Sequence, residues 1–384
     1  ITILKKKLAS QKVNLDELKC KKIISNLKEI GYPSYSEGEV IEHEAMVLNY
    51  VEKHEQANWV FHMILTDINE GNQSRTNDFR EDPAIKTGSA QEQDYFLKKL
   101  KSDSTYKYDG FGYDRGHLAP SADFRWSKKA LSESYFYSNM SPQKGEFNRE
   151  KWAELENWFR EYVTRNNVSL IVVTAPILNS ELPKVERSSN ALSIPKYYVK
   201  VALDLKNKRG VGFLLPHRKI IEPLEAFTVS IDSIEKVLGY DLFPKLDDLL
   251  ENNIESKVIY KPWLPIAQKN DVKAITSDRL PKNALNTSAV HSSIGDGKKH
   301  TVCGKVVSTK KHEKGHVFLN LDKKFPNHIF SVSIFTSSIK NFDYEPHIYL
   351  KNKNVCFTAE INEYKGTPSM IIDNGKQIKL LGEY

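Results

Sequence analysis

The stretch YDRGHLAP at residues 113–120 places an acid, a cation and an imidazole within four consecutive residues. Its glycine, Gly116, permits a close approach of the backbone to a neighbouring segment. An imidazole has an ordinary pKa of about 6.5, so a neutral His117 can accept a proton near neutral pH. A lone histidine is more often a packed or surface residue, and Asp114 with Arg115 could be a simple ion pair. The stretch alone therefore does not indicate a catalytic site, and a functional interpretation depends on the residues around it.

A second polar cluster follows, made of SNMSPQ at residues 138–143, FNREKW at residues 147–152, Glu156 and Arg160. Asn148 offers an amide oxygen that suits Mg²⁺, and a neutral ligand leaves the charge of the ion available to polarise a phosphoryl oxygen. If residues 151–164 form a helix, Glu156 could hold a metal-bound water, and Arg160 lies on the same helical face. The plainer alternatives are a helix N-cap for Asn148 and a surface ion pair for the other two residues.

Two loop arginines and one asparagine complete the set of candidate site residues. Arg75 and Arg80 lie in a polar loop, residues 66–80, and either could clamp a phosphate with two hydrogen bonds. The alternative for both is a solvated loop arginine. Asn139 could hydrogen-bond a phosphate, orient the site or satisfy a turn. A proton acceptor, phosphate-binding cations and an oxygen ligand for Mg²⁺ are the groups that phosphodiester cleavage needs.

The composition is that of an ordinary globular protein with two domains. The chain has 384 residues, of which 40% are hydrophobic and 27% charged, and this length exceeds one typical core. It contains no run of about 18 apolar residues, which excludes a membrane-spanning helix. Residues 271–384 hold 17 Lys and Arg against 11 Asp and Glu, so they carry almost all of the net charge of +7. A basic tail suggests a polyanionic partner, although a solubilising surface has the same charge.

The three cysteines, Cys20, Cys303 and Cys356, form no CxxC pair, which argues against a zinc site. Cys303 and Cys356 could form a disulfide, or both could be buried free thiols. Cysteine usage thus leaves the cellular compartment open, and the sequence leaves the oligomeric state undefined.

The pattern of apolar residues predicts an α+β fold. Residues 1–30 have apolar positions at helical spacing, and residues 31–265 mix strands and helices without a regular βαβ repeat. We expect strands near residues 45–51, 59–65, 170–174, 197–203 and 212–215, and helices near residues 151–164 and 230–238. The composition of residues 266–298, rich in Asn, Ser, Asp and Lys, predicts a linker. Five short β segments separated by turn residues then predict a small all-β barrel over residues 299–384.

Several separated motifs resemble, in the same order, those of the DNA/RNA non-specific endonucleases of the ββα-metal superfamily. They are DRGHLAP at residues 114–120, NMSPQ at residues 139–143, and Asn148 with Trp152, Glu156 and Arg160. The resemblance covers roughly residues 30–265. It implies a ββα-metal nuclease domain with a mixed sheet and helices, and DNA and RNA as substrates. It also implies Mg²⁺ as the cofactor, with Mn²⁺ as an alternative, and products with a 5′-phosphate and a 3′-hydroxyl.

The resemblance also implies a role for each residue of the two central motifs. His117 would be the general base, and Asn148 would be the sole direct protein ligand of the metal ion. Glu156 would hold metal-bound water. Arg115 and Asn139 would support the phosphate or the surroundings of the metal ion.

The remaining candidates are expected to contact the substrate. Arg160 would steady the scissile phosphate from its helix. An upstream arginine of the family also contacts phosphate; Arg75 is the expected equivalent here, with Arg80 as the alternative. We place Asp114 with these substrate-binding residues.

The tail, residues 299–384, resembles an OB-fold that would grip the substrate. In such a barrel the first and fourth strands can be neighbours, which would bring Cys303 near Cys356. Aromatic residues alternate with lysines in the tail, and we expect most rings in its core and one or two facing outward. We expect a secreted or periplasmic protein, because an unrestrained nuclease threatens its own cytoplasm. The alternatives are a nucleic-acid-binding protein with a degenerate nuclease domain and an enzyme for another phosphodiester.

Overall fold

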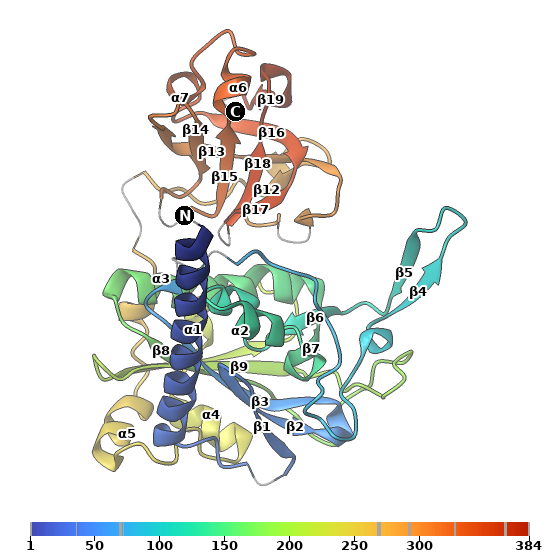
Figure 1. Cartoon of the computed structure of the whole chain (residues 1–384), viewed down its shortest axis with the longest axis vertical. Helices are drawn as coiled ribbons and strands as arrows, with labels where there is room; N and C mark the ends of the chain where they lie inside the picture. Colours follow the sequence, from blue (N-terminus) through green and yellow to red (C-terminus); the bar gives the residue numbers. More distant parts are fainter. Residues whose placement is uncertain are drawn as a thin grey trace. The chain divides into compact units, whose positions relative to one another are not determined.

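The chain folds into two compact units, Ile1–Leu264 and Pro265–Tyr384, called here the first and the second unit. The computed structural model describes residues 2–35, 37–68, 71, 73–266, 270–290, 293–325, 328–364 and 367–382 (Figure 1). The first unit combines helices with a sheet and the second consists mainly of strands, which confirms the predicted α+β class. No helix within these ranges is both long and apolar enough to cross a bilayer.

A seven-stranded antiparallel sheet forms the centre of the first unit (Figure 1). Its strands in spatial order are β1 (Glu39–Glu42), β2 (Met46–Val51), β3 (Gln56–Ile64), β8 (Leu170–Pro176), β9 (Tyr197–Asp204), β10 (Arg209–Pro216) and β11 (Thr228–Val229). The five strands expected in this part of the sequence are present, with ends shifted by a few residues. Strands β2, β3 and β8 are buried along their whole length, because their apolar and β-branched residues pack on both faces.

One face of the sheet, called here the site face, carries the motifs singled out in the sequence. Thr174, Lys200 and Phe213 are neighbours across β8, β9 and β10, so their side chains point to this same face. Phe213 packs there against Phe159 of helix α3 (Ala153–Asn166), with 6.0 Å between ring centroids. The predicted helix at residues 151–164 therefore exists and lies on the site face.

The opposite face, called here the far face, is covered by the helices α4 (Ile231–Leu238) and α5 (Asp248–Glu255). Two glycines of β10 make this packing close. A Cβ added at Gly212 would lie 2.6 Å from Cδ1 of Ile234, and one at Gly210 would lie 2.4 Å from Cγ2 of Ile254. Any side chain at either glycine would push a helix away from the sheet.

Helix α1 (Thr2–Ile30) also lies on the far face, where the sequence predicts a helical segment over residues 1–30. Asn26 contacts the sulfur of Met63 at 3.7 Å. Met63 lies two residues after Phe61 on β3 and shares its face. The sheet register continues from Phe61 through β8 and β9 to Gly212, so this face is the one that α4 covers.

Short elements around the site face complete the first unit. They are the paired strands β6 (Asp114–His117) and β7 (Met140–Gln143), helix α2 (Lys128–Glu133), and a π-helical turn, η6 (Phe147–Trp152), that leads directly into α3. A hairpin made of β4 (Phe96–Leu100) and β5 (Tyr106–Gly110) comes just before β6 and extends away from the sheet (Figure 1).

The second unit is built on an eight-stranded sheet. The strand order is β17 (Asn362–Tyr364), β18 (Thr367–Ile371), β15 (Phe330–Ile334), β14 (Val317–Leu321), β13 (Lys299–Lys311), β16 (Asn354–Glu360) and β19 (Ile378–Leu380), with β12 (Leu285–Asn286) beside β13 and the short helices α6 (Thr336–Ile339) and α7 (Pro346–Tyr349). Within the described part of this unit no backbone pairing joins β18 to β16, so the sheet stays open. The small all-β barrel predicted here is therefore not found as a closed barrel.

Residues 270–290 belong to the second unit, so the predicted linker over residues 266–298 is wrong for this part. β12 pairs with β13, and Val290 is fully buried in the apolar core. The hydroxyl of Thr287 donates a hydrogen bond of 2.6 Å to the buried carboxylate of Asp322. Composition suggested a linker because the segment is polar, yet its polar groups are bonded inside the fold. Residues 267–269 and 291–292 lie outside the described residues.

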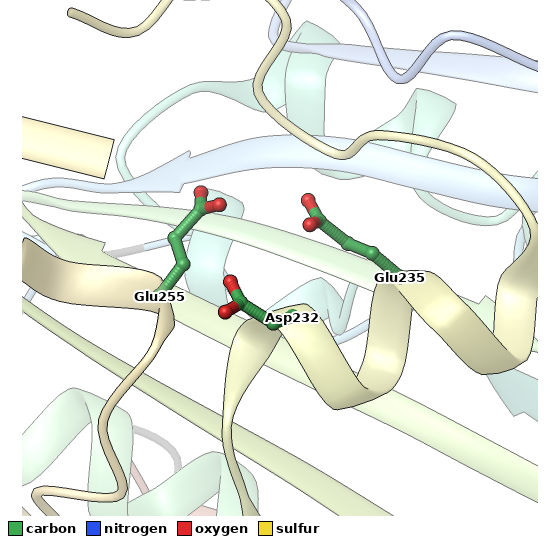
Figure 2. A group of neighbouring side chains, drawn as sticks. All are labelled: Asp232, Glu235 and Glu255. Carbon is green, nitrogen blue, oxygen red and sulfur yellow. The ribbon is translucent and has the colours of Figure 1, made fainter. Parts of the chain in front are cut away.

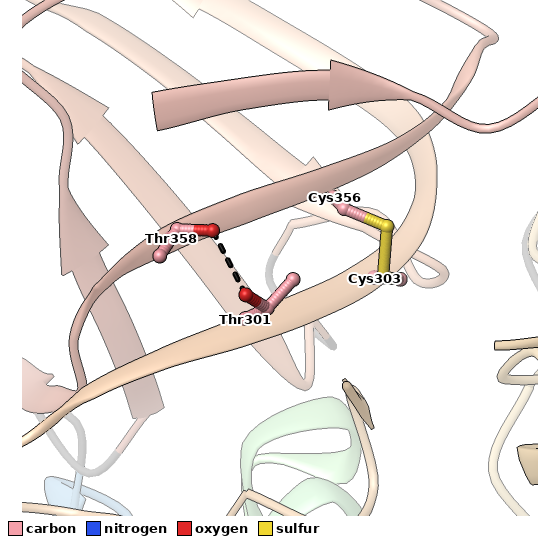
Figure 3. The surroundings of a disulfide bond; sticks show 4 residues. All are labelled: Thr301, Cys303, Cys356 and Thr358. Carbon is pink, nitrogen blue, oxygen red and sulfur yellow. Dashed lines mark hydrogen bonds between the residues drawn. A yellow bond between two sulfur atoms is a disulfide. The ribbon is translucent and has the colours of Figure 1, made fainter. Parts of the chain in front are cut away.

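A disulfide joins Cys303 of β13 to Cys356 of β16 (Figure 3). The two cysteines face each other in the antiparallel register of these strands. Two positions along, the hydroxyls of Thr301 and Thr358 share a hydrogen bond of 2.9 Å. The sequence allowed either a disulfide or two free thiols for this pair, and the structure contains the disulfide. Cys20 is a buried free thiol.

Candidate active site

The motif at residues 113–120 forms strand β6 and the loop after it. Gly116 of β6 packs closely against β7, because a Cβ added at this position would lie only 2.2 Å from Oε1 of Gln143. A larger residue would fit here only if the buried side chain of Gln143 moved. This contact is the physical reason for the glycine, and it places His117 at the end of β6.

The imidazole of His117 is kept neutral by its surroundings. It lies between the rings of Phe79 and Tyr135, with centroid distances of 5.6 and 5.1 Å, and no described residue hydrogen-bonds its buried Nε2. Burial lowers the pKa of His117 to about 3, and the positive charges of Arg75 and Arg115 act in the same direction. Since this pKa lies below the ordinary value, the imidazole stays uncharged at pH 5 and above and can accept a proton.

Asn139 holds the loop that follows His117. Its Oδ1 accepts a hydrogen bond of 2.9 Å from the backbone N–H of Ala119, and its Nδ2 donates to the carbonyl oxygens of Ala119 and Ser134 at 2.9 and 2.8 Å. The side chain is fully buried. Its polar atoms are engaged in the fold, so of the roles predicted for Asn139 the structure favours orienting the site.

Asn148 lies on the π-helical turn and is tied to the strand that carries His117. Its Nδ2 donates a hydrogen bond of 3.0 Å to Oδ2 of Asp114. Asp114 also forms an ion pair with Arg149, which donates from Nε at 2.7 Å and from Nη2. Asp114 was predicted to bind substrate, but its carboxylate is occupied by these two partners and would repel a phosphate. The structure instead makes it the residue that orients Asn148.

The amide oxygen of Asn148 is available to a ligand. No described residue hydrogen-bonds Oδ1, because the amide contacts Asp114 through its nitrogen. The first residue before α3 is Trp152, which makes no side-chain cap, so the alternative role of Asn148 as the N-cap of this helix is not taken. A fixed, neutral oxygen donor is a suitable ligand for a hard cation.

Glu156 and Arg160 lie one turn apart on α3, as the predicted helix requires. Their closest charged atoms, Oε2 and Nη2, are 4.0 Å apart. Nη1 of Arg160 donates at 2.9 Å to Oδ1 of Asp123, and its Nη2 donates at 2.7 Å to Oδ1 of Asn157. Burial raises the pKa of Glu156, and the positive charges of Lys200, Arg160 and Arg75 oppose this rise. Arg160 is therefore fixed by acceptors of the fold and helps to keep Glu156 ionised.

Two buried ionisable groups at the site were not among the predicted site residues. Asp123 accepts hydrogen bonds from Arg160 and, at 3.0 Å, from Nε2 of His62. Lys200 donates from Nζ to the hydroxyl of Thr174 at 2.7 Å and to the carbonyl of Leu118 at 3.1 Å. Burial lowers the pKa of Lys200 to about 8. Lys200 thus anchors the loop after His117 to the sheet.

The two loop arginines have different surroundings in the structure. Arg80 donates four hydrogen bonds, to the carbonyl and carboxylate of Asp78 and to the carbonyl and hydroxyl of Ser132, and its guanidinium lies 4.2 Å from the ring centroid of Phe136. Arg75 is exposed, and its charge acts on both His117 and Glu156. Arg75 is therefore the arginine placed to contact a ligand at the site.

Replacing Arg75 with alanine is expected to lower kcat/KM for nucleic-acid cleavage about 10- to 100-fold, because a charge-assisted contact contributes about 1.5–3 kcal/mol. The unfolding temperature should not change. Arg80→Ala is the matched control: it removes four hydrogen bonds of the fold, so the unfolding temperature should fall while kcat/KM is kept. The opposite pattern in the two variants would reassign the contact to Arg80.

Arg115 is stacked between aromatic rings beside the imidazole. Its guanidinium lies 3.7 Å from the ring centroid of Phe79 and 5.0 Å from that of Phe96, and its Nη1 is 3.5 Å from the hydroxyl of Tyr137. Phe79 also contacts His117. The cation is thereby held next to the general-base candidate, where it favours the neutral imidazole.

The predicted residues thus gather around one place, with different tasks. His117, Asn148, Glu156 and Arg75 are the candidates to meet a ligand, whereas Asp114, Asn139, Arg80 and Arg160 are engaged within the fold. His117 and Asp114 are three residues apart on β6, a distance of about 10 Å along a strand, and Asp114 binds Asn148. This arrangement can supply a proton acceptor, an oxygen ligand for a cation and a phosphate-binding arginine together.

Comparisons with known proteins show what the first unit is similar to. Residues 24–249 match the family model of the DNA/RNA non-specific endonucleases. The nuclease of Syncephalastrum racemosum is 31% identical over 247 residues, which cover 58% of this chain and 72% of that protein. The mitochondrial endonuclease G of Homo sapiens is 30% identical over 221 residues, covering 53% and 69%. The crystal structure of the EndoG/EndoGI complex matches at a TM-score of 0.49 and 26% identity, covering 58% of this chain and 92% of that one.

The matched region defines the class of the first unit as a nuclease domain. Since it spans more than half of the chain, the chain belongs to the DNA/RNA non-specific endonuclease family. The match contains β6, the π-helical turn and α3, and it ends before the second unit begins at Pro265.

Proposed function

We propose that this chain is a metal-dependent nuclease that hydrolyses phosphodiester bonds of DNA and RNA with little sequence preference and leaves 5′-phosphate ends. One observation carries the proposal: the neutral imidazole of His117 and the free amide oxygen of Asn148 are both fixed to strand β6. The imidazole is part of the strand, and the amide is attached to it through Asp114. We propose that this base and this metal ligand, both held by one short strand, act on the same phosphodiester.

Mg²⁺ fits the donors present at Asn148. A neutral oxygen, with water completing the coordination, is an arrangement that Mg²⁺ accepts, and Mn²⁺ binds the same kind of ligand. When bound, the ion would polarise a phosphoryl oxygen and stabilise the leaving oxygen. Asn148 would hold it directly, and the mostly buried carboxylate of Glu156 would accept hydrogen bonds from its water.

The side chains of the site would then divide the work of hydrolysis. His117 takes a proton from the attacking water, because its imidazole is neutral. Arg75, the exposed arginine, binds the phosphate. Arg160 keeps Glu156 and α3 in place through Asp123 and Asn157. None of these groups reads a base edge, so we expect weak sequence preference.

The β4–β5 hairpin supports a polynucleotide as the substrate. Tyr106 and Tyr108 are 49% and 55% exposed, and Nζ of Lys98 lies 4.6 Å from the ring centroid of Tyr106. Lys99, Lys101 and Lys107 are also exposed on this segment. Exposed rings among lysines can stack on bases and neutralise phosphates. The hairpin leads into β6 and so lies next to the candidate base in the chain.

The second unit is proposed to bind nucleic acid as an OB-like domain. In support, β13 pairs with both β14 and β16, and β15 pairs in parallel with β18, so the first and fourth main strands are neighbours. Four aromatic residues in the described part of this unit are exposed, Phe325, Phe335, Tyr349 and Tyr364, where one or two were expected. Weaker binding of single-stranded DNA by Phe325→Ala, with Phe325→Tyr as the ring-preserving control, would support this role, and unchanged binding would argue against it.

A secreted or periplasmic location is proposed as well. The Cys303–Cys356 disulfide is typical of proteins in oxidising compartments. Fractionation of the source cells, with the thiol state of the two cysteines measured in each fraction, tests this. Recovery of the reduced protein from the cytoplasm alone would contradict it.

The central experiment is cleavage of circular single-stranded DNA, duplex DNA and RNA with Mg²⁺, with Mn²⁺ and with EDTA. We expect all three polymers to be cut with metal and none with EDTA, and the cut of a circle shows endonucleolytic action. A 5′-phosphate on the products completes the test. Binding without cleavage in every metal would favour the alternative of a degenerate nuclease domain, and cleavage of a small diester alone would point to a different phosphodiester substrate.

A further inference from the structure

Three carboxylates converge between α4 and α5 on the far face of the sheet (Figure 2). Asp232 and Glu235 come from α4 and Glu255 from the end of α5, and one oxygen of each lies within 4.8 Å of the others. The two helices pack on β10 at its glycines. The helix that carries Glu156 packs on the opposite face, so this cluster is separate from the candidate active site.

Glu255 is the unusual member of the cluster. Its side chain is 1% exposed, and its Oε1 is buried without a hydrogen-bond partner among the described residues. In the same described ranges, none of the three carboxylates forms an ion pair with a lysine, arginine or histidine. A buried carboxyl oxygen without a donor or a cation costs free energy. Its position beside two further acids indicates that a cation is the missing partner.

We propose that Asp232, Glu235 and Glu255 bind one divalent cation, with Ca²⁺ as the preferred ion, and that this ion joins α4 to α5. Carboxylate oxygens are the ligands that hard divalent ions take. Ca²⁺ bonds of about 2.3–2.6 Å let two oxygens on opposite sides of the ion lie about 5 Å apart, whereas Mg²⁺ bonds of about 2.1 Å limit this to about 4.2 Å. The three oxygens lie within 4.8 Å of one another, a span that one Ca²⁺ ion covers. A site of three carboxylates suits Ca²⁺ better than Mg²⁺, because Mg²⁺ keeps several waters and requires near-octahedral geometry.

Protonation competes with the ion at this place. Burial raises the pKa of Glu255 to about 9, and the negative charges of Glu235, Glu251, Asp241 and Asp232 act in the same direction. Burial also raises the pKa of Glu235 to about 7, although its Oε1 accepts a hydrogen bond of 2.8 Å from the N–H of Leu242. A cation bound here would offset the cost of ionising these buried acids.

The test is thermal unfolding of the full chain, first freed of metal with EDTA and then titrated with Ca²⁺ or Mg²⁺. With Ca²⁺ at about 100 times its Kd, the unfolding temperature should rise by about 5–10 °C. Glu255→Gln keeps the shape of the side chain and should weaken Ca²⁺ binding at least tenfold. Glu251→Gln, a neighbouring acid on α5 outside the cluster, is the matched control and should keep the shift.

Two further variants keep the result decisive. Asp232→Asn alters an exposed ligand and should still fold, so its loss of Ca²⁺ binding, measured beside its unfolding temperature without Ca²⁺, would report on the site. Asn148→Ala should retain the full Ca²⁺ shift, because it lies in the other site, and this readout does not depend on nuclease activity. An unfolding temperature that Ca²⁺ leaves unchanged, or a shift that survives in Glu255→Gln and Asp232→Asn but is lost in Asn148→Ala, would overturn the proposal.

Discussion

Replacing His117 with alanine is expected to lower kcat for DNA cleavage by about 10²–10⁴-fold, the range that a positioned general base supplies. The imidazole is the proposed proton acceptor, and burial keeps it neutral by lowering its pKa to about 3. Its removal should leave substrate affinity almost unchanged, because the phosphate contact is assigned to Arg75. Steady-state cleavage of supercoiled plasmid measures the effect, and His312→Ala, an exposed histidine of the second unit, is the control.

Chemical rescue separates a catalytic loss from a structural one. Alanine at position 117 leaves space between the rings of Phe79 and Tyr135. Free imidazole should enter this space and restore part of the rate, whereas a misfolded variant would not respond. Cleavage by His117→Ala at the parental rate would remove His117 from the mechanism.

Replacing Asn148 with alanine is expected to remove metal binding at the active site and cleavage together. The amide oxygen is the proposed direct ligand, and loss of a group that stabilises the charge of the transition state costs about 10²–10³-fold in kcat. Asp114 keeps its ion pair with Arg149 in this variant, so β6 should stay in place. Mn²⁺ binding followed by electron paramagnetic resonance, alongside plasmid cleavage, measures both effects.

Two further variants serve as controls for the Asn148→Ala result. Asn148→Asp retains an oxygen ligand and should keep metal binding, although the added charge opposes the phosphate. Asn341→Ala, an exposed asparagine of the second unit, should behave like the parent. If Asn148→Ala bound Mn²⁺ at the active site with unchanged affinity, the ligand would have to be sought elsewhere, and Glu156 would be the next candidate.

The parts of the site that could be predicted are those encoded locally. Gly116 and His117 are adjacent on one strand, and Glu156 and Arg160 are one helical turn apart, so sequence spacing places each pair. The strands of the central sheet were also predictable, because short runs of apolar and β-branched residues favour buried β-strands.

The rest depends on contacts between distant residues. Asp123 lies on η4 (Ser121–Phe124) and Lys200 lies on β9 of the central sheet. Only the folding of the chain brings these two residues to the site, where Lys200 bonds the loop after His117. The choice between Arg75 and Arg80 rests on the hydrogen bonds of Arg80 to Asp78 and Ser132. The open sheet of the second unit depends on whether β16 and β18 pair, which no local pattern decides.

The π-helical turn at Phe147–Trp152 has a consequence for the two side chains proposed to hold the metal ion and its water. In a regular α-helix each residue rotates the chain by about 100°, so two side chains eight positions apart differ by about 80° in direction. A π turn takes in more residues for each revolution, which brings Asn148 and Glu156 towards a common direction. A regular α-helix over the same eight positions would leave both side chains in the protein but turn the amide about 80° away from the carboxylate.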